Sequence, residues 1–490
     1  MDYELLIRGA CVLDGSGAPG RVADVGVCDA RIALVGQAPA AARAPMQIDA
    51  AGRALAPGFI DVHTHDDTVV IRRPEMLPKL SQGVTTVVVG NCGISASPVR
   101  LRGAPPDPMN LLGPAEAFVY PSFRHYRDAV DAARPAVNVA ALVGHTALRS
   151  NHLDRLDRAA EAEEIAAMRA ELRQSLLDGA LGLSSGLAYG NAIHAPTGEV
   201  AQLAAELDAC GGVYATHLRS EFEPVLQAMD EAYAIGRAGR APVIVSHLKC
   251  AGAGNWGRSV EVLDSLERAA RMQAVGCDCY PYSASSSTLD LKQVTADFPI
   301  KITWSEAHPE MGGCLLADIA AQWQVSLEQA ARRLQPAGAV YYGMDESDVR
   351  RILAHPLTMV GSDGLPEDPL PHPRLWGAFA RVLGHYSRDV GLFPLHTAVH
   401  KMTGLSARRF GLKGRGVIEV GAYADLVLFD PVTVRDVADF DDPVQRSTGI
   451  EAVWVNGQLA YRDGEPGARA GRFLPREGDL RQGFVTPGAA

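Results

Sequence analysis

Apolar strands alternate with amphipathic helices through the middle of the chain, and this alternation constrains the fold more than any other feature. The predicted strands are 85–89, 138–143, 182–183, 213–216, 243–246, 276–280 and 358–360, and the predicted helices are 159–178, 198–210, 221–237 and 259–273. Repeated β-α units of this length predict an α/β fold, a parallel (β/α)8 TIM-type barrel. A doubly wound open sheet is the alternative. The chain has neither a Gly-x-Gly-x-x-Gly loop after a first strand nor a Walker loop, so a nucleotide site is unsupported.

Both ends of the chain carry short strands separated by turns. Residues 1–56 contain the hairpin break Asp14-Gly15-Ser16-Gly17, and residues 412–490 contain the turn signal Asn456-Gly457. We therefore expect a small β-sandwich built from 1–56 and 412–490, with the barrel occupying 57–411. Residues 283–345 interrupt the β-α rhythm with a serine-rich run, so we expect an inserted lid over the mouth of the barrel.

The composition narrows the class of protein. The 490 residues are 47% hydrophobic and carry a formal net charge of −11, spread along the chain. This charge argues against nucleic acid and against an anionic membrane surface as partners. No apolar run reaches membrane-spanning length and no signal peptide is evident, so we expect a cytoplasmic protein. The eight cysteines are scattered and form neither a disulfide framework nor a CxxC zinc knuckle.

Polar side chains follow several predicted strands at the point where each strand ends. These residues are His63 and His65 after an apolar run, Cys92 in Gly-Asn-Cys-Gly, His217, His247, and Asp363 in Gly-Ser-Asp-Gly. Taken singly, such a cysteine is usually a core residue, such a histidine structural, and such an aspartate a turn former. In a parallel barrel, however, strand ends converge on one rim, so these side chains are expected to meet. Cysteine and histidine ligands suit Zn²⁺, and a catalytic zinc needs three protein ligands and an open position.

An ordered set of motifs around these residues resembles the amidohydrolase superfamily, and in particular its N-acyl-D-amino-acid deacylase (D-aminoacylase) branch. The motifs run almost end to end: His63-Thr64-His65, Gly90-Asn91-Cys92-Gly93, Gly186-Leu187-Ala188-Tyr189, Thr216-His217-Leu218-Arg219, Ser246-His247-Leu248-Lys249, Tyr280-Pro281-Tyr282, Gly361-Ser362-Asp363-Gly364, His372-Pro373-Arg374, and Gly421 to Val427. The resemblance implies the same barrel, sandwich and lid, and hydrolysis of an N-acyl-D-amino acid to a carboxylate and a free D-amino acid. The D stereochemistry comes from the resemblance alone.

The resemblance also assigns roles to the strand-end residues. It implies one tight zinc held by Cys92, His217 and His247, a weaker second metal position near His63 and His65, and Asp363 as the proton carrier. Such a zinc lowers the pKa of its water from roughly 15.7 to about 7. His145, in Val-Gly-His after a strand, is either an oxyanion-stabilising residue or a structural one.

The substrate's α-carboxylate needs cationic partners. Lys249, two residues past His247, shares its face if the strand continues, and Arg374 has the planar fork that suits a carboxylate. By resemblance, Tyr280 joins them. Surface charges are the structural alternative for Lys249 and Arg374.

The side chain of the substrate needs its own recognition residues in the pocket. Some members of the resembled branch act on N-acyl-D-glutamate or N-acyl-D-aspartate and use a basic residue in the lid. By that resemblance we expect Lys292, Ser286 and Tyr189 to read an acidic side chain. The alternatives are that Lys292 faces solvent or pairs with Asp290, because burying an unpaired ammonium is costly.

The sequence leaves two other functions open. Cyclic amide and imide hydrolases of the same superfamily generally bridge two metals through a modified lysine at a strand end, and no obvious lysine fills that position. A non-catalytic scaffold protein of this fold would typically have lost metal ligands, whereas the expected ligands are all present.

Overall fold

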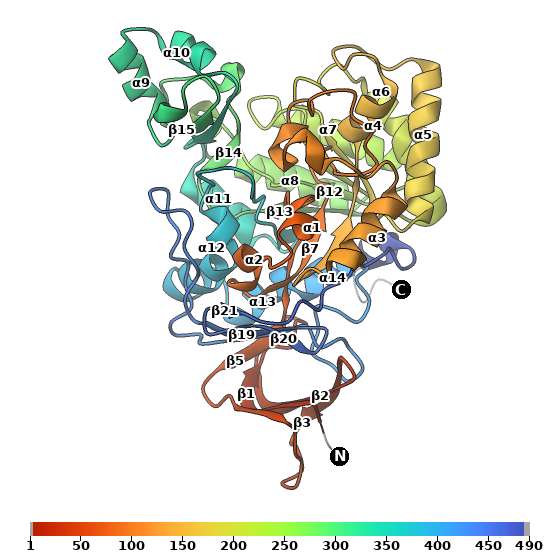
Figure 1. The fold of residues 1–490 in the computed structure, drawn as a ribbon, viewed down its shortest axis with the longest axis vertical. Helices are drawn as coiled ribbons and strands as arrows, with labels where there is room; N and C mark the ends of the chain where they lie inside the picture. The colour runs from red at the N-terminus through yellow and green to blue at the C-terminus, as the bar shows by residue number, and fades with distance from the viewer. Residues whose placement is uncertain (1–2, 485–490) are drawn as a thin grey trace.

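The computed structural model describes residues 3–484, and its centre is a parallel barrel of eight strand positions (Figure 1). The strands are β6 (Phe59–Asp61), β7 (Val84–Val89), β8 (Asn138–Ala141) continued by β9 (Val143–Gly144), β10 (Gly182–Gly186), β11 (Val213–His217), β12 (Val243–Val245), β13 (Val275–Cys279) and β17 (Thr358–Val360). Each pairs in parallel with the next. A parallel bridge between Thr64 and Gly364, just beyond β6 and β17, closes the ring. The predicted barrel is confirmed and the open sheet is wrong.

Helices cover the outside of this barrel. They are α1 (Val69–Arg72), α2 (Leu77–Leu80), α3 (Phe123–Ala133), α4 (His145–His152), α5 (Ala162–Leu177), α6 (Thr197–Ala204), α7 (Val225–Ala238), α8 (Ser259–Ala270), α11 (Glu346–Ala354), α12 (Arg374–Arg381), α13 (Leu395–Met402) and α14 (Gly404–Arg409). The strands are nearly all apolar and buried, as parallel strands covered on both faces must be. None of the helices in residues 3–484 combines the length and apolar character needed to cross a lipid bilayer.

A second sheet takes its strands from both ends of the chain. Its order is β21-β20-β19-β18-β5-β1-β2-β3, with β4 beside β1. The strands are β1 (Leu5–Val12), β2 (Arg21–Cys28), β3 (Arg31–Gly36), β4 (Met46–Asp49), β5 (Ala54–Pro57), β18 (Leu426–Phe429), β19 (Ile450–Val455), β20 (Gln458–Arg462) and β21 (Glu465–Pro466). The two ends join where β5 pairs antiparallel with β18. The chain then returns to the barrel, where Leu474 N donates to Val139 O at 2.7 Å.

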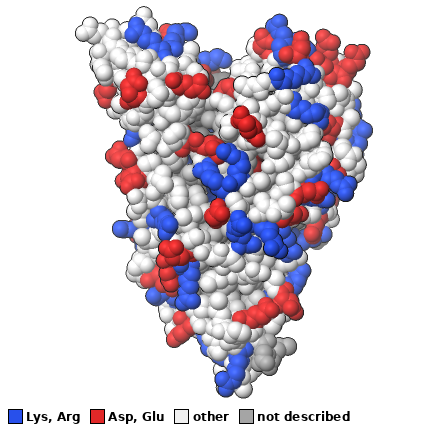
Figure 2. Space-filling view, viewed as in Figure 1, with Lys and Arg blue, Asp and Glu red and all other residues white. Residues whose placement is uncertain are grey.

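The segment inserted between β13 and α11 has its own sheet and its own apolar core. Its strands β14 (Ser285–Thr288), β16 (Ala337–Tyr341) and β15 (Ile300–Ser305) are antiparallel, and α9 (Leu316–Trp323) and α10 (Leu327–Leu334) pack on them. Figure 1 shows α9 and α10 standing apart from the barrel helices. The same face in Figure 2 has acidic and basic side chains interspersed, with a notch between this insert and the barrel.

A buried lysine holds together the two strand ends that close the barrel. Lys79 Nζ donates to Asp61 Oδ2 at 2.8 Å, to Thr64 Oγ1 at 2.9 Å and to Ser362 Oγ at 2.9 Å. Asp61 in turn accepts from the main-chain N of Ser362 at 2.8 Å. Lys79 and Asp61 are fully buried. This network therefore fixes the loop that carries His63 and His65 against the loop that carries Asp363.

We expect Lys79→Met to lower the free energy of unfolding by about 3–5 kcal/mol, because it leaves buried carboxylates without their cation. Urea unfolding monitored by circular dichroism measures this loss. Lys413→Met, at an exposed lysine, is the control and should change stability little. A loss below about 1 kcal/mol for Lys79→Met, the value of an exposed ion pair, would contradict this role.

Candidate metal centre and active-site pocket

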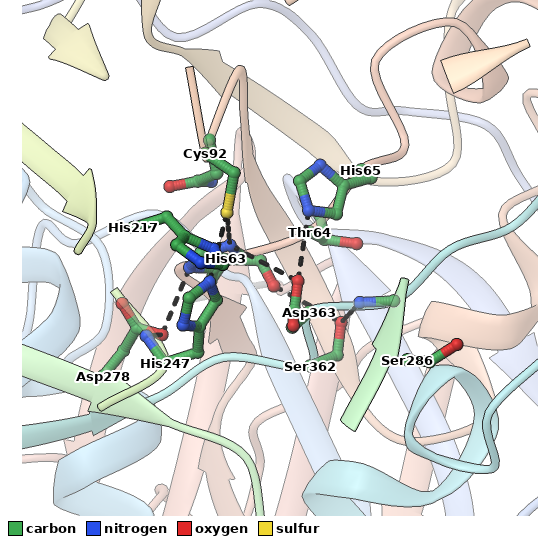
Figure 3. A network of polar contacts seen from close by, with 12 residues as sticks. His63, Thr64, His65, Cys92, His217, His247, Asp278, Ser286, Ser362 and Asp363 are labelled. Atoms are coloured by element: carbon green, nitrogen blue, oxygen red, sulfur yellow. Dashed lines mark hydrogen bonds and ion pairs between the residues drawn. The ribbon is translucent and has the colours of Figure 1, made fainter. Parts of the chain in front are cut away.

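The carboxyl ends of five barrel strands bring the predicted donors together (Figure 3). Cys92 Sγ, in the turn after β7, lies 3.2 Å from Nε2 of His63 and 3.2 Å from Nε2 of His247. The ring of His217, at the end of β11, lies 4.5 Å from that of His247. On the other side of His63, Nε2 of His65 lies 3.1 Å from Asp363 Oδ1. A single thiol is thus surrounded by imidazoles, with a carboxylate beside them.

Three of these donors have left-handed backbone conformations. The φ angles are 54° at Cys92, 35° at His247 and 48° at Asp363. Positive φ is uncommon outside glycine and clusters at functional sites, where the surrounding structure compensates for the strain. The donor atoms of all three residues lie within 4.8 Å of one another.

Two carboxylates absent from our sequence-based set orient the histidines. Asp278 Oδ1 lies 3.2 Å from His63 Nδ1, and Glu221 Oε1 lies 2.9 Å from His247 Nδ1. Histidines that bind a metal usually give their other ring N–H to such a carboxylate, which turns the remaining nitrogen toward the ion. The sequence carries weak signals for both: Asp278 interrupts an apolar strand, and Glu221 lies four residues after His217.

These residues fit a zinc ion by donor chemistry and by spacing. The donor atoms of His63, Cys92, His247 and Asp363 all lie within 4.8 Å of one another, and those of His217, Glu221 and His247 form a second, overlapping group. Burial alone raises the pKa of Cys92, but His63 and His247 hold it well below its ordinary value. A thiolate flanked by imidazoles is a donor set typical of Zn²⁺.

Asp363 is a buried carboxylate that stays ionised. Arg374 Nη1 lies 2.8 Å from Asp363 Oδ2. Burial raises the pKa of Asp363, but Arg374 and the neighbouring histidines lower it well below its ordinary value. The side chain is therefore unprotonated at neutral pH, as a proton acceptor must be.

A pocket of about 760 Å³ opens onto this cluster. Its lining includes all but two of the remaining residues that we predicted from the sequence: Tyr189, Lys249, Tyr280, Ser286 and Lys292. Lys249 Nζ lies 2.5 Å from Glu221 Oε1, and the hydroxyl of Tyr189 lies 3.2 Å from His217 Nδ1.

Arg374 and His145 lie away from the lining. Arg374 is buried behind Asp363 and donates to the main-chain O of Ser286 at 3.1 Å. His145 Nε2 is 2.9 Å from Glu199 Oε1, and that carboxylate also pairs with Arg149. This placement favours the structural role for His145 over the oxyanion role.

The similarities to known proteins agree with this geometry. The model of the Amidohydrolase family matches residues 47–461. The chain belongs to the amidohydrolase family.

Individual relatives are similar over almost their whole length. The D-aminoacylase of Alcaligenes xylosoxydans xylosoxydans is 49% identical, with 97% of this chain and 98% of that protein covered. The N-acyl-D-aspartate deacylase of the same organism is 49% identical, with 96% and 95% covered. The structure of N-acyl-D-glutamate deacylase from Bordetella bronchiseptica, complexed with zinc and a phosphonate that mimics the tetrahedral intermediate, is 45% identical and superposes with a TM-score of 0.93. That match covers 97% of this chain and 100% of the other.

We expect Cys92→Ala to abolish tight zinc binding, because the thiolate supplies both the charge and the softness of the donor set. Metal analysis after dialysis against a weak chelator measures the zinc content. Cys277→Ala is the matched control, since Cys277 is equally buried but burial raises its pKa to about 12. Full zinc content in Cys92→Ala would remove this residue from the metal site.

Proposed function

We propose that this protein is a zinc-dependent hydrolase of the amide bond of N-acyl-D-amino acids. One observation carries the proposal: histidines of the metal-binding cluster, the Asp363 carboxylate and the Lys249 ammonium line the same pocket, with the Cys92 thiolate buried directly behind those histidines. An N-acyl amino acid presents a scissile amide and an α-carboxylate, and this pocket offers a partner to each. The D-aminoacylase and the two D-specific deacylases named above support the class of reaction and the D configuration.

Cys92, His217 and His247 would hold the tight zinc, with His63 and His65 near a second position. When bound, zinc supplies a water that is nucleophilic at neutral pH and polarises the scissile carbonyl. To bind one zinc together with the Cys92 thiolate, the histidines must direct their Nε2 atoms toward Cys92. Asp278 lies 3.2 Å from Nδ1 of His63 and Glu221 lies 2.9 Å from Nδ1 of His247, the positions from which carboxylates orient metal-binding histidines.

Asp363 moves the proton. It accepts a proton from the attacking water and delivers it to the amide nitrogen, because an amine anion is a very poor leaving group. Its Oδ1 lies within 3.5 Å of Nε2 of both His63 and His65, and Arg374 fixes its Oδ2. We assign Arg374 to the orientation of Asp363.

Lys249 and Tyr280 bind the α-carboxylate. Lys249 Nζ lies 5.6 Å from the centre of the Tyr280 ring, and both side chains line the pocket. The carboxylate of Glu221 keeps the buried ammonium charged, and the pKa of Lys249 is raised although burial alone would lower it. A charged Lys249 places the amide of the substrate over the metal-binding cluster.

The lid end of the pocket supports a preference for acidic side chains. Lys292 is exposed at the pocket and has no ion pair among residues 3–484. The buried hydroxyl of Ser286 likewise lacks a hydrogen-bond partner within the described part of the chain. A side-chain carboxylate would satisfy both groups. Asp107 and Asp290 line the same pocket, and their negative charge would repel an acidic side chain. Rates on acidic and apolar substrates therefore decide the preference.

The direct test of the function is a screen of N-acetyl-D- and N-acetyl-L-amino acids for release of the free amine. We expect hydrolysis of D substrates, faster than of their L enantiomers, and loss of activity after zinc is removed by chelation. Dihydrouracil and hydantoin serve as cyclic substrates. Preferred opening of a cyclic amide would support the cyclic-amide alternative instead, and no turnover of any amide by zinc-loaded protein would support a scaffold.

Asp363→Asn should retain the fold and the zinc yet lower kcat by about 10²- to 10⁴-fold, because asparagine is nearly isosteric but cannot accept a proton. Steady-state kinetics on the best D substrate, with zinc content measured on the same sample, gives the result. Turnover near the parent rate would rule out Asp363 as the proton carrier.

Lys292→Met should lower kcat/KM for N-acetyl-D-glutamate by about ten- to a hundredfold, the value of one charge-assisted hydrogen bond. Activity on N-acetyl-D-leucine should change little. The matched control is Lys301→Met, which alters a lysine of the same insert that pairs with Asp441 outside the pocket. Equal responses of the two substrates, or a parent enzyme that prefers leucine, would show that Lys292 does not select acidic substrates.

A further inference from the structure

One carboxylate contacts both a candidate metal ligand and the candidate substrate-binding lysine. Glu221 Oε1 lies 2.9 Å from His247 Nδ1 and 2.5 Å from Lys249 Nζ. His247 directs its other nitrogen, Nε2, to Cys92 Sγ at 3.2 Å. Glu221 therefore lies where the metal-binding cluster and the carboxylate-binding part of the pocket meet.

The main chain fixes Glu221 in this place. Its carbonyl O accepts a hydrogen bond of 2.8 Å from the main-chain N of Ala251, two residues after Lys249. The loop after β11 is thus bonded to the loop after β12 through main chain and side chain together. Glu221 is 9% exposed, so water screens its interactions little.

The contacts of His247 explain why a carboxylate is needed at Glu221. Lys249 Nζ lies only 2.8 Å from His247 Nδ1. When Nε2 faces a metal, Nδ1 carries the hydrogen, so the histidine and the lysine present two N–H donors to each other. Glu221 Oε1 accepts a hydrogen bond from Lys249 Nζ and lies 2.9 Å from His247 Nδ1, so it offers an acceptor to both donors and removes the conflict. Without it, the imidazole ring or the ammonium must turn away.

We propose that Glu221 is a positioning residue that holds His247 toward the metal and Lys249 toward the substrate's α-carboxylate at the same time. Metal affinity and substrate affinity then depend on one carboxylate. The substrate half of this inference rests on the proposed function, whereas the metal half does not.

Four variants separate the two effects. Glu221→Gln keeps the shape and one acceptor oxygen but removes the charge, and Glu221→Ala removes the acceptor as well. Lys249→Met alters only the substrate-binding cation and leaves Glu221 to hold His247. Glu171→Gln is the matched control, because Glu171 also pairs with a histidine and a cation, His152 at 2.8 Å and Arg100 at 2.5 Å, outside the pocket.

Zinc affinity is measured on metal-free protein by competition with a fluorescent chelator, and KM and kcat are measured with saturating zinc on the best N-acyl-D-amino acid. Glu221→Ala should weaken zinc binding by about 10- to 100-fold, the usual effect of removing such a partner of a metal-binding histidine. Its KM should rise by about tenfold or more, as expected for loss of a charge-assisted interaction. Glu221→Gln should show both effects to a smaller degree. Lys249→Met should raise KM alone, and Glu171→Gln should change neither quantity.

Zinc affinity and KM both within about twofold of the parent in Glu221→Gln and Glu221→Ala would overturn the proposal. Should Glu221→Ala fail to fold by circular dichroism, Glu221→Gln decides. If zinc affinity falls while KM stays at the parent value, Lys249 does not depend on Glu221 and the dual role is wrong. If the parent hydrolyses no N-acyl-D-amino acid, the proposed function fails, and the zinc measurement alone still judges whether Glu221 orients His247.

Discussion

The thiolate of Cys92 is the interaction on which the rest of the site depends. It lies 3.2 Å from two imidazole nitrogens, and its left-handed turn places it inside the ring of strand ends. A buried thiolate is costly unless cations or a metal compensate it. The surrounding structure provides that compensation: His63 and His247 face the sulfur, Asp278 and Glu221 orient these rings, and Lys79 locks the two strand ends that close the barrel. The position of Cys92 among these donors therefore depends on the histidines, on the carboxylates beside them, and on the network around Lys79.

Much of this arrangement is predictable from the sequence because strand ends of a parallel barrel converge. The β-α alternation indicates the barrel, and a polar residue after each apolar run identifies donors that the structure brings together, such as His217 and Asp363. Partners of buried charges are harder to predict. Lys79 lies on a short helix, and nothing in its sequence neighbourhood shows that it reaches Ser362, 283 residues away. The position of Arg374 behind Asp363 likewise depends on how α12 begins.

Under the proposed function, the insert supplies the part of the pocket that selects among substrates. Its strands and helices pack on an apolar core of their own, so its pocket-facing residues can differ without disturbing the barrel. Ser286 and Lys292 enter the pocket from this segment, whereas Lys249, Tyr280 and Asp363 come from the barrel. In the proposed function, this division gives the reaction and recognition of the α-carboxylate to the barrel, and recognition of the substrate side chain to the insert. Arg374 links the two, since it contacts Asp363 and the main chain of Ser286.

The most direct test of this account is the return of activity as zinc is added to metal-free protein. With a D substrate in excess, the rate should be negligible without metal, rise linearly with zinc, and reach its maximum at about one zinc per chain, as a three-ligand site with one open position requires. Full activity in metal-free protein, or no activity until a second zinc has bound, would contradict the single tight centre at Cys92.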